Sequence, residues 1–203
     1  MAVKDHSLDD KIIRAATGDF MEHGYRKASL HKIAERAGIT TGALYTRYRN
    51  KDALFCSLVH SALSSIRPHL RSVGDAYEKA GASRDGETLL GAIRQEEKIY
   101  LDLLFEHYDA CVLFFCRSDG SSVEEELHQL MEFKAAETVR FLKKLEKQDT
   151  LDLDGVSFIM AEQFHFYREI LQRGYTKEKA ISCMETVDTF LEAGWKALFE
   201  KIL

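Results

Sequence analysis

The stretch SLHKIAERAGITTGALYTRYRNK, residues 29–51, constrains the fold of this chain more than any other part. Its first apolar side chains recur at the spacing of one helical face: Leu30, Ile33, Ala34 and Ala37. Ser29 is a suitable residue to cap the start of this helix, and Gly38 to end it in the left-handed conformation. Either Thr40 or Thr41 can then cap a second, very short helix. Two helices joined by so tight a turn predict a helix-turn-helix.

The second helix of this motif would present small, hydroxylated or cationic side chains to solvent. Between residues 24 and 51 the chain carries seven basic residues and one acid, Glu35, a net charge of +6, whereas the whole chain has a net charge of −5. Such a local excess of cations favours phosphate binding, because cations displace the counterions condensed on DNA. A packing unit with an ordinary solvated face is the alternative. The positive net charge and the capping residues favour, over this alternative, a helix that enters the major groove of DNA.

The same stretch resembles the DNA-binding head of TetR-type transcriptional regulators. The resemblance rests on Ala34, on residues 37–45, on Arg47 and Tyr48, and on residues 51–54, and it covers about residues 8–56. Two positions depart from the family pattern: Arg47 replaces a common histidine, and Tyr48 replaces the usual phenylalanine.

These patterns predict which residues contact DNA. We expect Arg47 and Lys51 to bind phosphates; Thr41, Ala43 and Thr46 to read base edges; and His31 to reach a groove edge or a phosphate. The full set of expected DNA contacts is Ser29, His31, Lys32, Thr40, Thr41, Gly42, Ala43, Tyr45, Thr46, Arg47 and Lys51.

The rest of the 203 residues indicates an all-α chain, because it has one proline, Pro68, and no alternating apolar pattern. We expect a three-helix N-terminal bundle in residues 1–50, joined to a larger helical domain in residues 51–203 for effector binding and dimerisation. The first 51 residues carry a net charge of +4 and the remaining residues a net charge of −9. We therefore expect the basic first part to bind nucleic acid and the larger acidic part not to bind it. Pro68 should kink or end the helix that begins at residue 51. The other expected helices are 7–24, 89–105, 108–116, 123–147, 153–173 and 176–202, with loops at 81–86, 118–122 and 149–154.

The helix of residues 153–173 is apolar nearly all round and needs partners on both sides. The core of one monomer can cover one face of the last two helices, which predicts a second subunit against the other face. A deeply buried helix in a monomer is the alternative. The family resemblance implies a four-helix dimer interface, and a twofold dimer would place two recognition helices ~34 Å apart on a palindromic operator. The interface candidates are Phe158, His165, Phe166, Phe190, Trp195 and Phe199.

Many aromatic residues would surround the interior of the larger domain. The resemblance implies a pocket there for a small, largely apolar effector, which would shift the population of head-to-head spacings through the helix of residues 51–67. Plain core packing is the alternative for each residue. The candidates are Phe55, Tyr100, Phe105, His107, Tyr108, Phe133, Gln163, Phe164 and Tyr167, with His165 as a further polar group.

Other functions find less support in the sequence. His107 and Cys111 have helical spacing but make too few ligands for zinc, and no nucleophile–base pattern or cofactor motif occurs. A regulator that senses redox state or metal through Cys111, Cys116 or His107 is the alternative function. Four cysteines without a CxxC motif, a polar N-terminus and no apolar run of ~18 residues predict a cytoplasmic protein that has no membrane partner. No cofactor or metal is expected.

Overall fold

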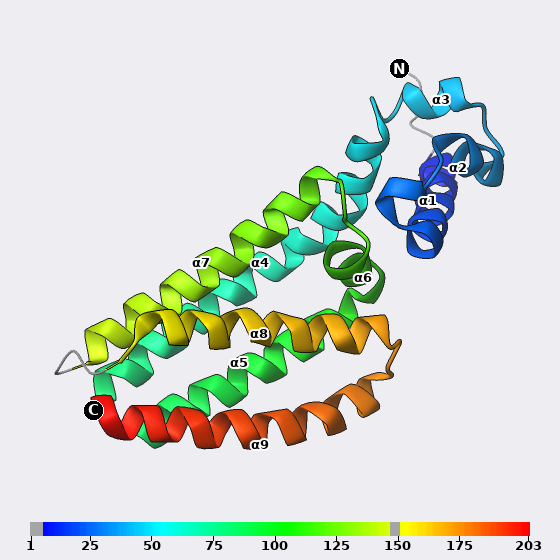
Figure 1. Cartoon of the computed structure of the whole chain (residues 1–203). Coiled ribbons are helices and arrows are strands. Elements are labelled where there is room, and N and C mark those ends of the chain that lie inside the picture. The colour runs from blue at the N-terminus through cyan, green and yellow to red at the C-terminus, as the bar shows by residue number, and fades with distance from the viewer. Residues whose placement is uncertain (1–5, 147–150) are drawn as a thin grey trace. The chain divides into compact units, whose positions relative to one another are not determined.

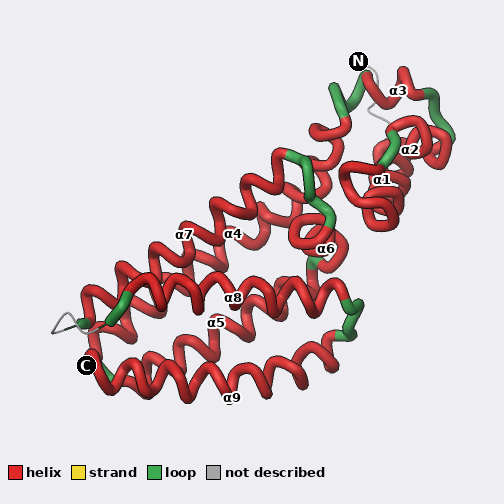
Figure 2. The backbone as a smooth tube through the Cα atoms, viewed as in Figure 1, coloured by secondary structure: helices red, strands yellow, loops and turns green. Residues whose placement is uncertain are grey.

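The computed structural model describes residues 6–146 and 151–203, and over these residues the chain is helical and contains no strand (Figure 1, Figure 2). The predicted all-α fold is confirmed. The helices are α1 (His6–Lys27), α2 (Leu30–Ala37), α3 (Thr41–Tyr45), α4 (Lys51–Ser83), α5 (Gly86–Glu106), α6 (Tyr108–Cys116), α7 (Ser122–Leu145), α8 (Leu153–Gln172) and α9 (Lys177–Ile202). The predicted polar N-terminal segment and the predicted loop at 149–154 fall partly outside the described residues.

The sequence predicts a helix end at Gly24 and a kink or an end at Pro68. Gly24 has non-helical angles, φ 71° and ψ 167°, and ends the first regular stretch of α1, after which a short helical segment continues to Lys27. Pro68 lies inside α4, which continues to Ser83, so the helix does not end at the proline. A proline removes only one backbone donor, and the helix tolerates that single loss. The predicted bend at His107 is present between α5 and α6.

The chain divides into two compact units whose limits differ from the predicted domains. The first unit comprises residues 1–64 and 107–128, and the second comprises residues 65–106 and 129–203. The start of α4, the whole of α6 and the start of α7 therefore belong to the same unit as the helix-turn-helix.

The core of the first unit comes from the apolar faces of α1, α2 and α4. On α1 the apolar residues Ile12, Ala16 and Phe20 are spaced four apart on one face and are fully buried. The Phe20 ring meets the Phe55 ring edge to face, with centroids 4.9 Å apart. Aromatic contacts of this kind add to the free energy gained by burial, and they fix α4 against α1.

The second unit is a layered helical bundle. In Figures 1 and 2, α4 and α7 run side by side, and Gly81 lies so close to Phe141 that an added Cβ would be 2.7 Å from the ring. Helices α5 and α9 also pack together. The buried cluster of this unit is Ala80, Leu89, Leu90, Leu142, Leu145, Val156, Met160, Trp195, Phe199 and Ile202.

Candidate nucleic-acid interface

The turn between α2 and α3 has the backbone geometry that the sequence predicts. Gly38 is left-handed, with φ 71° and ψ 32°, and the N–H of Ile39 donates to the carbonyl of Ala34 at 3.0 Å. The hydroxyl of Thr40 accepts a hydrogen bond from the N–H of Ala43 at 3.1 Å, so Thr40 is the cap of α3. These local bonds fix the short α3 relative to α2.

The predicted hydroxyl cap of Ser29 is wrong, because the Ser29 side chain makes no capping bond. The Ser29 N–H donates instead to the carboxylate of Asp19, at 3.0 Å from Oδ2. Asp19 is fully buried on α1, and Arg36 of α2 lies 3.5 Å from its other oxygen. A buried carboxylate therefore joins α1 to both ends of α2, a role that the sequence analysis did not assign.

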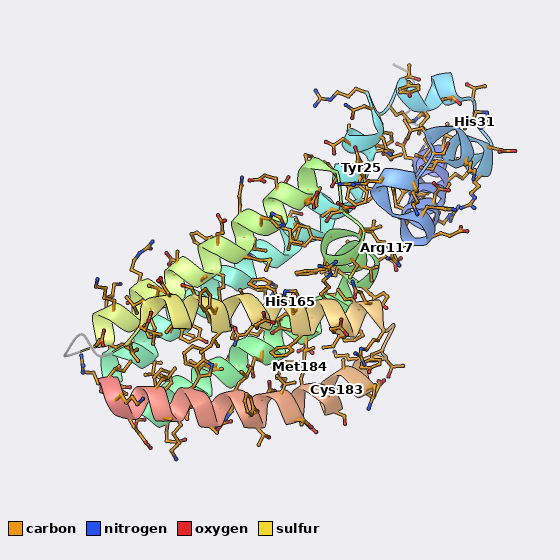
Figure 3. All side chains as sticks on the ribbon, in the orientation of Figure 1. Tyr25, His31, Arg117, His165, Cys183 and Met184 are labelled. Carbon is orange, nitrogen blue, oxygen red and sulfur yellow. The ribbon has the colours of Figure 1, made fainter. Side chains whose placement is uncertain are left out.

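Helix α3 is anchored by one buried residue, leaves Thr41 and Ala43 half-buried and exposes Gly42 and Tyr45. Leu44 is fully buried, whereas the Tyr45 side chain is 51% exposed. The hydroxyl of Thr46 lies 2.8 Å from the carbonyl of Ala43 and 3.1 Å from that of Gly42. The Thr46 proton is therefore directed at the helix backbone, and the hydroxyl is left to act towards a base as an acceptor. His31 and Lys32 are exposed on α2 (His31 is labelled in Figure 3).

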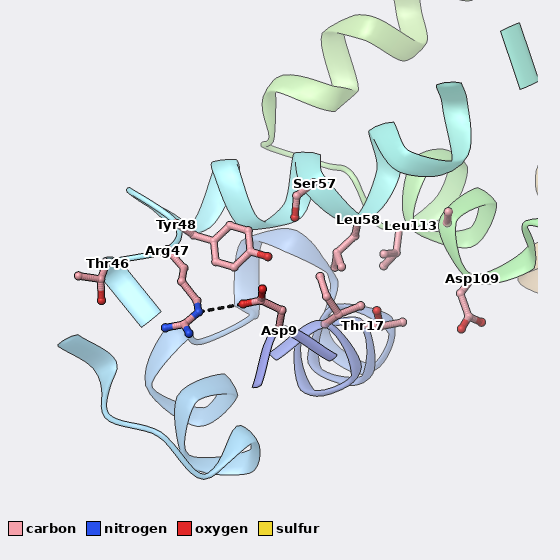
Figure 4. Close-up of a pocket in the computed structure, with 11 residues that line it drawn as sticks. Asp9, Thr17, Thr46, Arg47, Tyr48, Ser57, Leu58, Asp109 and Leu113 are labelled. Atoms are coloured by element: carbon pink, nitrogen blue, oxygen red, sulfur yellow. Dashed lines mark hydrogen bonds and ion pairs between the residues drawn. The ribbon is translucent and has the colours of Figure 1, made fainter. Parts of the chain in front are cut away.

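The two cations expected to bind phosphates both have partners within the first unit. Arg47 Nε donates to Asp9 Oδ1 at 2.9 Å, as Figure 4 shows. Lys51 Nζ donates to the carbonyls of Arg26 and Ala28, at 3.1 and 3.3 Å, and lies 4.5 Å from the centre of the Tyr25 ring. A cation at the carboxyl end of a helix is favourable, so Lys51 stabilises the end of α1.

The turn between α6 and α7 is bonded to α1 and α4. The N–H of Tyr25 donates to the carbonyl of Arg117 at 2.9 Å, and Arg117 Nε donates to the carbonyl of Met21, also at 2.9 Å (Tyr25 and Arg117 are labelled in Figure 3). The positive φ of Gly24 directs the Tyr25 N–H away from its own helix and makes the first of these bonds possible. The turn between α6 and α7 is therefore part of the first unit, which also contains α3.

Asp52 at the start of α4 caps α7 within the same unit. Its two oxygens accept from the N–H and the hydroxyl of Ser122, at 3.0 and 2.7 Å. Burial alone would raise the pKa of the Asp52 carboxyl, but the hydrogen bonds from Ser122, Cys56 and Tyr25 outweigh it and lower the pKa. Asp52 is therefore charged at neutral pH, which suits a cap at a helix amino terminus.

The effector candidates are divided between the two units. Phe55, His107 and Tyr108 lie in the first unit, where Phe55 is fully buried against Phe20 and Tyr25. Phe55 is thus a core residue of the first unit. Phe133 is 62% exposed, which corrects its expected place in an interior. The others, Tyr100, Phe105, Gln163, Phe164 and Tyr167, lie in the second unit and are partly buried.

Residues that the sequence analysis did not select form a polar cluster in the second unit. Glu96 is buried on α5, accepts a hydrogen bond from Tyr77 at 2.5 Å and forms an ion pair with Lys134 of α7. The Tyr100 and Tyr167 rings meet edge to face, 6.1 Å apart. Burial, followed by the nearby charge of Glu96, raises the pKa of both tyrosines. Both hydroxyls therefore stay protonated at neutral pH.

The dimer candidates on α8 and α9 fall into two groups. Phe158 and Phe190 are 72% and 80% exposed, and His165 is exposed. Phe166 is half-buried. Trp195 and Phe199 are buried in the core of the second unit, with rings stacked 6.0 Å apart, which corrects their expected place at an interface. The sequence of α9 did not reveal which of its aromatic residues face inward.

The thiols of α6 have the character of core residues. Cys111 is buried, and burial raises its pKa to about 12, which keeps it protonated and poorly reactive. Among the described residues no cluster of three or more His, Cys, Asp or Glu side chains could hold a metal ion. No helix in the described part of the chain is long and apolar enough to cross a bilayer.

Known bacterial repressors are similar to this chain in sequence. Residues 12–58 match the model of the bacterial regulatory proteins of the tetR family. The chain is 27% identical over 165 residues to the probable acrEF/envCD operon repressor of Escherichia coli K12, covering 76% of this chain and 71% of that one. It is 28% identical over 201 residues to the class A tetracycline repressor from transposon 1721 of Escherichia coli, covering 94% and 84%.

A solved structure has the same fold over almost the whole chain. A TetR-family transcriptional regulator from Bordetella parapertussis superposes with a TM-score of 0.62 at 18% identity, and the match covers 97% of this chain and 95% of that one. The family model covers the helix-turn-helix, and the relatives and the structure extend the likeness to the helices beyond it. The helix-turn-helix region of this chain belongs to the tetR family of bacterial regulatory proteins, and the chain as a whole is similar to TetR-type transcriptional repressors.

Proposed function

We propose that this protein is a dimeric, non-enzymatic repressor that binds a palindromic DNA operator and is released from it by a small, largely apolar effector. The observation that carries the proposal is the exposure of a short helix, α3, in a head with net positive charge: Leu44 alone anchors it, and no acidic side chain lies between Thr40 and Lys51. Both relatives in the comparison are named as repressors, which supports this mode of control.

The DNA contacts are assigned by position. Arg47 and Lys51 would bind phosphates, together with the amino terminus of α4, where Asn50 caps the N–H of Ala53 at 2.7 Å. Thr41, Ala43 and Thr46 would read base edges, and His31 would lie at the groove edge or on a phosphate. A DNA regulator acts where the chromosome lies, so we place the protein in the cytoplasm.

The dimer is supported by two aromatic side chains that the protomer leaves in solvent. Phe158 and Phe190 are the most exposed large apolar side chains of the described residues, on α8 and α9. Burying a phenylalanine side chain contributes roughly 1.5–3 kcal/mol, so a second copy gains from covering them. A twofold pair of heads then requires two half-sites about one turn of DNA apart.

The effector would bind in the part of the chain from residue 51 to 203. The edge-to-face pair of Tyr100 and Tyr167, beside the buried Glu96, supplies aromatic surface and polar groups from α5 and α8. This combination suits an apolar ligand that carries a few polar groups. Effector binding would favour a head-to-head spacing that no longer matches the operator, transmitted through α4.

One experiment tests the core of the proposal. The purified full chain is used to select sequences from a random pool of duplex DNA, and the mass of the complex is measured by sedimentation. We expect a palindromic site that holds two chains. A chain that stays monomeric, or that binds no duplex at low ionic strength, would refute the proposal.

A further inference from the structure

A single ion pair joins the exit of α3 to the first turn of α1. Arg47 lies in the segment between α3 and α4, and its Nε donates to Asp9 Oδ1 at 2.9 Å. The two side chains are 30% and 27% exposed. They lie at one cleft of about 830 Å³ in the first unit, whose lining also includes Thr46 and Tyr48 (Figure 4).

The way in which the carboxylate holds the guanidinium matters. The hydrogen bond between the two side chains is at Nε, and the terminal Nη1 and Nη2 groups have no hydrogen-bond partner among the described residues. A carboxylate that sequestered Arg47 from DNA would engage it through two parallel hydrogen bonds, which is the stronger geometry. A bond at Nε alone leaves the two terminal groups, a planar pair of donors that suits phosphate oxygens.

We propose that Asp9 is a positioning residue for DNA binding: it holds Arg47 by Nε so that Nη1 and Nη2 can bind a phosphate of the operator. The inference rests on the proposed phosphate contact of Arg47. The benefit is entropic, because a free arginine side chain loses rotamer freedom when it is fixed. In this protein the ordering occurs before DNA arrives, which is preorganisation.

For Asp9→Ala, a purely electrostatic argument and the positioning role of Asp9 predict opposite changes in DNA affinity. Removing a negative charge from a DNA-binding surface should tighten binding, because DNA is a polyanion. Positioning by Asp9 predicts the reverse for Asp9→Ala. Asp10 supplies the matched control: it is the next residue of α1, it is exposed, and it makes no ion pair with a described residue.

The experiment measures operator affinity of the full chain by fluorescence anisotropy over a range of salt concentrations, for wild type, Asp9→Ala, Asp9→Asn, Asp10→Asn, Arg47→Ala and the double variant Asp9→Ala/Arg47→Ala. We expect Asp9→Ala to bind about fivefold more weakly, equivalent to about 1 kcal/mol. Its salt slope should fall by up to about 1, as for the loss of one phosphate contact. Asp9→Asn keeps an oxygen that can accept from Nε and should stay within about twofold of wild type. Asp10→Asn should bind as tightly as wild type or slightly more tightly.

The double variant separates positioning from a general structural effect. If Asp9 acts through Arg47, then Asp9→Ala costs nothing further when Arg47 is already alanine. Binding by Asp9→Ala that is as tight as that of Asp10→Asn would overturn the inference, and so would a loss that persists in the Arg47→Ala background. Should Asp9→Ala fold poorly by circular dichroism, the comparison of Asp9→Asn with Arg47→Ala decides: a loss in Asp9→Asn as large as that in Arg47→Ala would also overturn it.

If the protein does not bind DNA as proposed, the affinities of the variants follow a different pattern. If wild type and Asp10→Asn bind no duplex, the proposed DNA-binding role is refuted. If they bind but Arg47→Ala binds equally well with an unchanged salt slope, the phosphate contact is wrong and the inference with it. If Arg47→Ala weakens binding and Asp9→Ala does not, the inference about Asp9 alone is wrong.

Discussion

The buried carboxylate of Asp19 accepts the backbone N–H of Ser29 at 3.0 Å, so a side chain of α1 holds the residue that immediately precedes α2, while the Ser29 hydroxyl makes no capping bond. The bond joins residues that are ten positions apart. It ties the start of the helix-turn-helix to α1, and the contact of Arg36 with the same carboxylate ties its other end.

Asp19→Ala should therefore destabilise the protein, and Ser29→Ala should not. Removing the carboxylate leaves the Ser29 N–H without its partner, which costs about 1–3 kcal/mol. The Ser29 hydroxyl makes no capping bond, so its loss should change the free energy of unfolding by less than about 0.5 kcal/mol. Urea denaturation of both variants tests this. A larger loss in Ser29→Ala than in Asp19→Ala would contradict the assignment of the cap.

Stability should fall as pH rises through neutrality because of Glu97. Burial, together with the charge and hydrogen bond of Asp188, raises the Glu97 pKa from 4.5 to about 8. Between these two values the native state holds a proton that the unfolded chain has released, so raising the pH favours unfolding. The slope from one such group is at most about 1.4 kcal/mol per pH unit.

Glu97→Gln should reduce this dependence, because the amide stays neutral at every pH and only Asp188, whose pKa is also raised by burial, still titrates in this pair. We expect the variant to be more stable than wild type at pH 8.5 and to have a flatter stability profile between pH 6 and 8.5. Glu162→Gln is the matched control, since Glu162 is exposed on α8. Thermal melts of all three proteins across this range provide the measurement. A wild-type stability that rises over the same range would exclude the raised pKa.

Base reading and phosphate binding should separate in mutants of α3 and of the segment that follows it. Arg47→Ala should weaken binding on all sequences to a similar extent and lower the salt slope by about 1. Thr41→Ala and Ala43→Gly should instead alter which bases are preferred, by roughly 1–3 kcal/mol at one position. Repeating the selection from random DNA with each variant distinguishes the two effects. An altered consensus for Arg47→Ala, or an unaltered one for both α3 variants, would contradict these assignments.

The sequence predicted best the features that depend on near neighbours. The left-handed Gly38 and the Thr40 cap each involve bonds within five residues, and both are present. Partners far apart in the chain could not be predicted in this way. The bond between Arg117 and Met21 and the ion pair of Glu96 with Lys134 depend on how helices pack, which no local pattern encodes.

The sequence also could not show which side of a helix with several aromatic residues faces the protomer core. Phe190, Trp195 and Phe199 are equally apolar in sequence, yet the structure exposes the first and buries the other two. The hydrophobic pattern of α9 therefore predicted a buried helix but not which side faces the protomer core. The same limit applied to Phe55, which the periodicity placed on an inner face without saying which core it joins.

The exposed Phe190 and the buried Trp195 of α9 allow dimerisation and folding to be tested separately. Phe190→Glu introduces a charge at a position that is 80% exposed in the protomer, so the fold of one chain should tolerate it within about 0.5 kcal/mol. At a dimer interface the same charge would be buried without a partner, which is strongly unfavourable. Trp195→Ala is the contrasting variant: it removes a buried core ring and should lower the free energy of unfolding of the protomer itself by about 3–5 kcal/mol. Sedimentation velocity and circular dichroism together test the pair. We expect a folded monomer with weakened operator binding for Phe190→Glu; a Phe190→Glu variant that remains dimeric at micromolar concentration would show that this face of α9 does not form the interface.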